Sequence, residues 1–87
     1  GTYIIVSDDE ILSAIAELGE VGVFAEPAGA ASYAGLVKAA GSGVVRSDEP
    51  ILVLNTGSGL KDVKAAMQAV VEAPVIEPTL EALKKLL

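Results

Sequence analysis

Hydroxyl and glycine residues gather in one short segment that could carry chemistry, Asn55-Thr56-Gly57-Ser58-Gly59. It directly follows the apolar run 51–54. A hydroxyl at the end of a strand, followed by glycines, can be aimed at a ligand that approaches the backbone closely, and the next helix adds the positive end of its dipole. An ordinary strand-to-helix turn is the alternative explanation. The glycine order fits neither the P-loop nor the dinucleotide-binding fingerprint.

A second candidate segment, Glu26-Pro27-Ala28-Gly29-Ala30, places a carboxylate beside the start of a helix rich in small residues. This carboxylate could face a ligand, or it could simply interact with the helix dipole or cap the helix. The acidic run 8–10 is typical of a solvated first helical turn, for the same dipole reason. Lys61 and Lys64 flank another helix start, where we expect a surface role because nothing nearby would desolvate either amine.

The residue types that are missing exclude several kinds of site. The chain contains no cysteine and no histidine. It therefore cannot form a disulfide framework, a thiolate nucleophile, a Cys/His zinc site or a Ser-His-Asp triad. We predict no metal site. The chemistry that remains uses carboxylates, hydroxyls, lysines, backbone amides or a borrowed cofactor.

Size and composition indicate a chain that folds by itself or as part of a larger folded protein. It has 87 residues, of which 52% are hydrophobic, and a net charge of -6. That hydrophobic content argues against disorder, and the acidic balance makes nucleic acid and anionic membranes poor partners. No apolar run approaches a membrane span of about 18 residues, and the N-terminus lacks a signal-peptide pattern, so we expect a cytoplasmic protein. Because the chain begins at Gly1 without a methionine, we also expect a piece of a longer protein.

The spacing of the hydrophobic residues, and the positions of glycine and proline that end elements, predict alternating strands and helices. Ser7 and Glu10 have the spacing of a capping box, and Gly19 is placed to end the helix that follows them. Residues 41–43, Gly-Ser-Gly, should end the alanine-rich helix. The predicted elements are strand 2–6, helix 8–18, strand 22–25, helix 28–40, strand 51–54, helix 61–73, a proline-containing connector, and an amphipathic tail helix over 79–87.

This order predicts an α/β fold with a parallel sheet and right-handed crossovers. The uninterrupted apolar run 51–54 is typical of a parallel strand that is covered on both faces. Three strands alone would leave open sheet edges, so we expect a larger chain or a tight homo-oligomer to supply the rest. Loops 7–10, 26–30 and 55–59 would then lie at the carboxyl edge of the sheet, where ligands bind in such folds.

Two motifs together resemble the C-terminal portion of threonine synthase. They are Val23-Phe24-Ala25-Glu26-Pro27-Ala28-Gly29-Ala30-Ala31-Ser32 and Leu54-Asn55-Thr56-Gly57-Ser58-Gly59-Leu60-Lys61-Asp62. The lead-in 6–12 also resembles that family, whose fold group includes threonine dehydratase and the tryptophan synthase β chain. The resemblance implies that residues 1–87 are a single C-terminal segment of a larger catalytic domain that binds pyridoxal 5'-phosphate. The implied fold is a three-layer parallel-sheet fragment of a fold-type II enzyme, βαβαβα plus a tail helix.

The resemblance also implies cofactor-binding roles for individual residues. The hydroxyl of Thr56 would donate a hydrogen bond to the pyridine nitrogen of the cofactor. Glu26 would line the pocket near the ring, and Ala28 and Gly29 would permit close approach. Gly57 and Gly59 would shape the loop beneath the ring.

By the same resemblance, the parent enzyme would convert O-phosphohomoserine and water to threonine and phosphate. The family's Schiff-base lysine, in a Ser-x-Lys-x-Arg setting, and its glycine-rich phosphate loop do not occur in these 87 residues. We therefore expect no catalytic residue in this segment and no activity from the segment alone. The alternatives are a segment of a related lyase, such as threonine dehydratase or a phosphoserine-using paralogue, and a non-catalytic α/β binding module.

Overall fold

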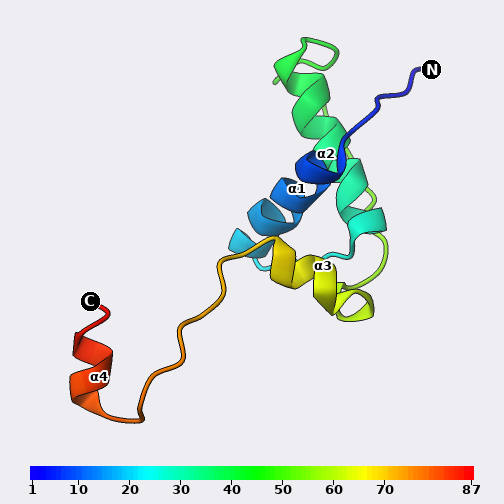
Figure 1. Cartoon of the computed structure of the whole chain (residues 1–87). Coiled ribbons are helices and arrows are strands. Elements are labelled where there is room, and N and C mark those ends of the chain that lie inside the picture. Colours follow the sequence, from blue (N-terminus) through cyan, green and yellow to red (C-terminus); the bar gives the residue numbers. More distant parts are fainter.

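Helix α1 (Asp8–Glu20) and helix α2 (Pro27–Gly41) pack against each other and form the body of the molecule (Figure 1). The structure is a computed structural model that describes all residues, 1–87. A single 3₁₀ turn, η1 (Gly59–Lys61), precedes the short helix α3 (Val63–Gln68), which lies against α1. A last helix, α4 (Leu80–Lys84), follows an extended linker. None of these helices combines the length and the hydropathy that a membrane-spanning helix requires.

The predicted α/β fold is wrong, because the structure contains helices and irregular segments but no β-strand. The predicted strands 2–6 and 51–54 are irregular, and residues such as Tyr3 and Leu52 are 84% and 85% exposed. The one β-type pairing is an isolated antiparallel bridge between Ala25 and Ser58. An apolar run indicates only that burial is favourable, whereas a strand also needs a neighbouring extended segment to share its hydrogen bonds. These segments have no such neighbour here.

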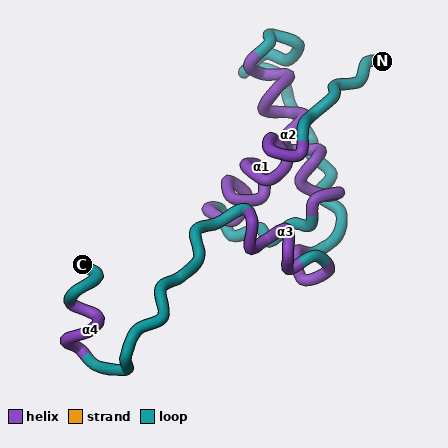
Figure 2. Tube along the Cα trace, viewed as in Figure 1, coloured by secondary structure: helices purple, strands orange, loops and turns teal.

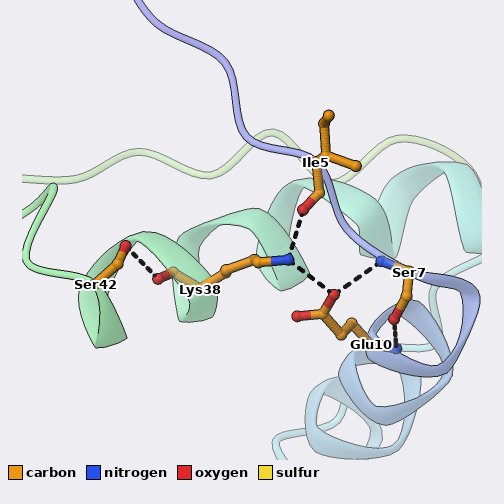
Figure 3. A network of polar contacts seen from close by, with 5 residues as sticks. All are labelled: Ile5, Ser7, Glu10, Lys38 and Ser42. Carbon is orange, nitrogen blue, oxygen red and sulfur yellow. Dashed lines mark hydrogen bonds and ion pairs between the residues drawn. The ribbon is translucent and has the colours of Figure 1, made fainter.

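The predicted capping box at the start of α1 is confirmed, and it extends into a network that joins α1 to α2 (Figure 3). The backbone N–H of Ser7 donates to Glu10 Oε1 at 2.9 Å, and the N–H of Glu10 donates to Ser7 Oγ at 3.1 Å. From α2, Lys38 Nζ reaches the same Glu10 oxygen at 3.2 Å and donates to the carbonyl of Ile5 at 2.8 Å. The N-terminal segment, α1 and α2 are therefore held together at one point.

Both long helices end on a glycine with a positive φ. Gly22, at φ +87°, follows the last turn of α1, and the N–H of Val23 donates back to the carbonyl of Leu18 at 2.9 Å. This is the Schellman arrangement, so Gly22 ends α1 and the predicted stop at Gly19 is wrong by one turn. Gly43, at φ +78°, ends α2 in the same way, which confirms the predicted end of that helix.

The core is small and consists mainly of alanine. Its buried side chains are Ala14, Ile15, Leu18, Ala25, Ala30 and Ala34. The alanine-rich helix α2 packs against α1. Small side chains on both helices allow this close approach, but they bury little apolar area and so contribute little stabilisation per residue.

The C-terminal third is less helical than its pattern predicts. Helix α3 ends at Gln68 although the pattern predicts a helix to residue 73, and α4 covers only five of the nine residues predicted. The β-branched pair Val70-Val71 and the nearby Pro74 disfavour continuation of α3. The β-branched side chains lose rotamer freedom in a helix, and proline biases the residue before it towards extended backbone. The linker 71–79 runs away from the body and carries α4 at its far end (Figure 2).

Candidate functional site

The two candidate segments, 26–30 at the start of α2 and the loop 55–59, lie against each other although the rest of α2 and residues 42–54 separate them in the sequence. Ala25 and Ser58 form the antiparallel bridge, and the backbone N–H of Gly59 donates to the carbonyl of Phe24 at 3.0 Å. The start of α2 and the segment before η1 are thereby fixed to one another. We call this contact between the two loops the loop junction.

Gly29 brings α2 and the second loop into direct contact. A Cβ atom at Gly29 would overlap the backbone carbonyl oxygen of Thr56 and would stand 2.9 Å from Oδ1 of Asn55. Gly29 is also buried, unlike most residues of the chain. Only a residue without a side chain fits this position, because backbone atoms of the opposite loop already fill the space.

The two other predicted glycines have the same kind of role. A Cβ atom at Gly57 would collide with the carboxylate of Glu26, and one at Gly59 would collide with the ring of Phe24. Gly57 also has a φ of +76°, in the left-handed region that favours glycine. The glycines of the second loop therefore seat it against residues 24 and 26. They do not border an open cavity.

Ser32 is a junction residue that the sequence did not single out. Its Oγ lies 2.7 Å from the carbonyl oxygen of Leu54 and 2.8 Å from that of Gly29, so its hydroxyl can donate to either oxygen. This side chain fastens the end of the apolar run 51–54 to the first turn of α2. A serine one turn after Gly29 in an alanine-rich helix is the only signal in the sequence that could have pointed to it.

The four predicted cofactor-binding residues differ in their accessibility. Gly59 is buried and Glu26 is partly buried, whereas Thr56 and Gly57 are exposed. The hydroxyl of Thr56 has no hydrogen-bond partner within the chain. None of these residues lines a cavity of the structure. The loop junction thus offers an open surface with a free hydroxyl, near a carboxylate.

Two ionisable groups with displaced pKa values lie outside the loop junction. Hydrogen bonding to the backbone of Ser7, and then to the side chain of Lys38, lowers the pKa of Glu10. Hydrogen bonding to the Glu17 carboxylate, followed by the negative charge of that group, raises the pKa of Tyr33. Both displacements belong to the contact between α1 and α2.

Comparison with known proteins gives one consistent result. No protein-family model matches the sequence. The chain is 43% identical over 83 residues to threonine synthase of Methanocaldococcus jannaschii, which covers 94% of this chain and 20% of that protein. Identity to threonine synthase of Methanosarcina acetivorans is 37% over 86 residues, covering 98% of this chain and 21% of the relative. Identity to threonine synthase of Mycobacterium tuberculosis is 42% over 79 residues, covering 90% of this chain and 21% of that protein.

Over most of its length, the chain is homologous to about one fifth of threonine synthase. This confirms the resemblance that the two motifs indicated. The chain spans about a fifth of the length of these curated relatives.

Proposed function

We propose that residues 1–87 form one wall of the pyridoxal 5'-phosphate site in a threonine-synthase-like enzyme that converts O-phosphohomoserine and water to threonine and phosphate. Homology to a fifth of threonine synthase supports the proposal. The structural observation that carries it is the loop junction, in which segments 26–30 and 55–59 meet and leave the Thr56 hydroxyl exposed without a partner.

In the proposal, the residues of the loop junction face one edge of the cofactor. When bound, pyridoxal 5'-phosphate supplies an electron sink. In the proposal, Thr56 donates a hydrogen bond to the pyridine nitrogen. A neutral hydroxyl suits an unprotonated nitrogen, whereas a carboxylate would favour the protonated ring. Glu26 stands beside Gly57, and we assign it to the lining of the same edge.

The remaining contacts of the cofactor must come from other residues. The chain contains neither the Ser-x-Lys-x-Arg motif nor the glycine-rich phosphate loop that the resemblance to threonine synthase implies for the parent enzyme. We therefore propose that this segment holds and orients the cofactor. The reacting groups are supplied by the rest of a longer chain in the same cytoplasmic enzyme. On this proposal the segment by itself has no activity.

A segment exchange tests the proposal. Residues 1–87 would replace the homologous fifth of the Methanocaldococcus jannaschii threonine synthase, and phosphate release from O-phosphohomoserine would be measured. We expect a folded chimera that binds pyridoxal 5'-phosphate, seen by its absorbance, and releases phosphate. A chimera that folds and binds the cofactor but is inactive on O-phosphohomoserine would contradict the proposed substrate. A folded chimera that no longer binds the cofactor would contradict the proposed wall.

A further inference from the structure

An uncovered apolar groove lies between α1 and α3, which we call the α1–α3 groove. It encloses about 570 Å³, and seven of its nine lining residues are hydrophobic. Ile15 lies at its base, where it is buried, while Phe24, Met67 and Val70 remain about half exposed. Apolar side chains of the groove are therefore in contact with water, which is unfavourable.

Helix α4 and the residues after it carry exposed leucines, and no residue of α1, α2 or α3 packs on them. Leu80 and Leu83 lie three residues apart on one face of α4, and Leu87 follows just beyond the helix; their side chains are 64%, 45% and 94% exposed. Figure 2 shows α4 well away from α1, α2 and α3. The chain thus contains both an apolar groove and an amphipathic helix of suitable chemistry.

We propose that α4 folds back and docks its leucine stripe into the α1–α3 groove of the same chain. The linker 71–79 begins immediately after Val70, which itself lines the groove. Nine extended residues reach up to about 30 Å, so the linker is long enough to turn and lay a five-residue helix along the groove. Such a short tether keeps the local concentration of the tail in the millimolar range, which favours its own groove over that of a second copy.

The last turn of α4 and the last turn of α1 carry opposite charges. Glu20 lines the groove, Glu17 lies one turn before it, and the last turn of α1 contains no basic residue. The carbonyl end of α1 adds partial negative charge at the same place. Lys84 follows Leu83 in α4 and flanks the leucine stripe. Docking would bring this ammonium group to the acidic end of α1.

Cysteine pairs test the proposal directly, because the chain has no native cysteine. The pair Met67→Cys with Leu83→Cys joins the groove to the docking face of the tail. The matched pair Met67→Cys with Glu81→Cys uses a residue on the opposite face of α4. Under mild oxidation of the full chain at low concentration, we expect the first pair to form an intramolecular disulfide about tenfold faster than the second, because docking raises the local concentration of one face only.

Each other outcome overturns the proposal. Equal rates for the two pairs would show an undocked tail that samples the groove at random. Disulfide-linked dimers from the first pair, with a yield that rises with protein concentration, would show that a second copy fills the groove.

A labelling experiment covers the case in which disulfide geometry is unsuitable. The single variant Met67→Cys should react with a soluble maleimide about fivefold more slowly than the same variant carrying Leu83→Gln, as expected if about four-fifths of the chains are docked. The control substitution Glu81→Gln should leave the rate unchanged. Equal labelling in all three proteins would show that the tail never covers the groove.

Discussion

At the scale of single residues, the contact between Gly29 and the Thr56 carbonyl decides how close α2 comes to the second loop. The backbone atoms meet where a side chain would otherwise stand. The position of the Thr56 hydroxyl is a consequence of this contact, because the loop that carries it is held at Gly29, Gly57 and Gly59.

We expect Gly29→Ala to destabilise the chain by about 1–3 kcal/mol, the usual cost of forcing extra atoms into a packed position. The matched control is Gly35→Ala in the same helix, where a Cβ atom meets nothing within 4 Å. There, alanine should stabilise the helix by about 0.5–1 kcal/mol. Urea unfolding followed by circular dichroism measures both. Equal effects of the two substitutions would mean that the loop junction does not form.

Thr56→Val keeps the shape of the side chain and removes its hydrogen-bond donor. In the active chimera we expect a loss in kcat of about tenfold or more with the cofactor still bound, because the lost hydrogen bond is worth about 1.4 kcal/mol or more. Thr2→Val, the same change at an exposed position of the N-terminal segment, is the control and should leave kcat unchanged. Unaltered kinetics for Thr56→Val would remove the role assigned to Thr56.

At the scale of elements, α1 is fixed at its N-terminus by the capping box and at its C-terminus by Gly22. Ser7→Ala removes the side-chain acceptor for the Glu10 N–H, so we expect a loss of about 1 kcal/mol in the free energy of unfolding. Ser13→Ala, at an exposed position inside the helix, should be neutral or slightly stabilising. A cost at Ser13 equal to that at Ser7 would contradict the capping role.

The same network predicts part of the dependence of stability on pH. Hydrogen bonding to the Ser7 backbone and to Lys38 lowers the pKa of Glu10 from its ordinary 4.5. A carboxylate with a lowered pKa in the folded state contributes its full stabilisation above the unfolded pKa, and this is lost as the pH falls through the folded pKa. The chain should therefore lose stability below about pH 4.5 as Glu10 is protonated.

Substitution isolates this contribution. Glu10→Gln should lower stability at neutral pH and flatten the decline on the acid side, as measured by thermal melts across about pH 3 to 7, a range that brackets the ordinary carboxylate pKa. Asp9→Asn, which also removes a charge from the first turn of α1, should leave that decline in place. An acid decline that is identical in wild type and Glu10→Gln would show that another group causes it.

At the scale of the whole molecule, little of the chain is protected from water. Ten of 87 residues are buried, and the exposed apolar side chains include Tyr3, Ile5, Leu52 and Leu54. Exposed apolar segments without a hydrogen-bonding neighbour favour association with other chains.

We therefore predict that the isolated chain self-associates, with a sedimentation coefficient that rises with protein concentration. The double substitution Leu52→Ser and Leu54→Ser should reduce this association, because it removes two of the most exposed apolar side chains from one segment. Serine in place of the two exposed alanines Ala28 and Ala40 is the control. A monomer at every concentration would contradict the prediction.

The parts of the fold that the sequence predicted depend on contacts within a few residues. The capping box of Ser7 and Glu10 and the end of α2 at Gly43 are both of this kind. The homology to threonine synthase was also readable from two local motifs. Local hydrogen bonds and backbone preferences are encoded by neighbouring residues, so they can be inferred without knowing the rest of the molecule.

The sequence alone determined the two long helices, the acidic charge, the absence of cysteine and histidine, and the relationship to threonine synthase. The tertiary structure alone decided that the apolar run 51–54 forms no strand, that α2 packs on α1, and that Gly29, Gly57 and Gly59 join two loops. Pairing and packing depend on which distant segments come together. An apolar residue or a glycine indicates only that another segment can pack closely at that position. Which segment packs there depends on the folded structure of the whole chain.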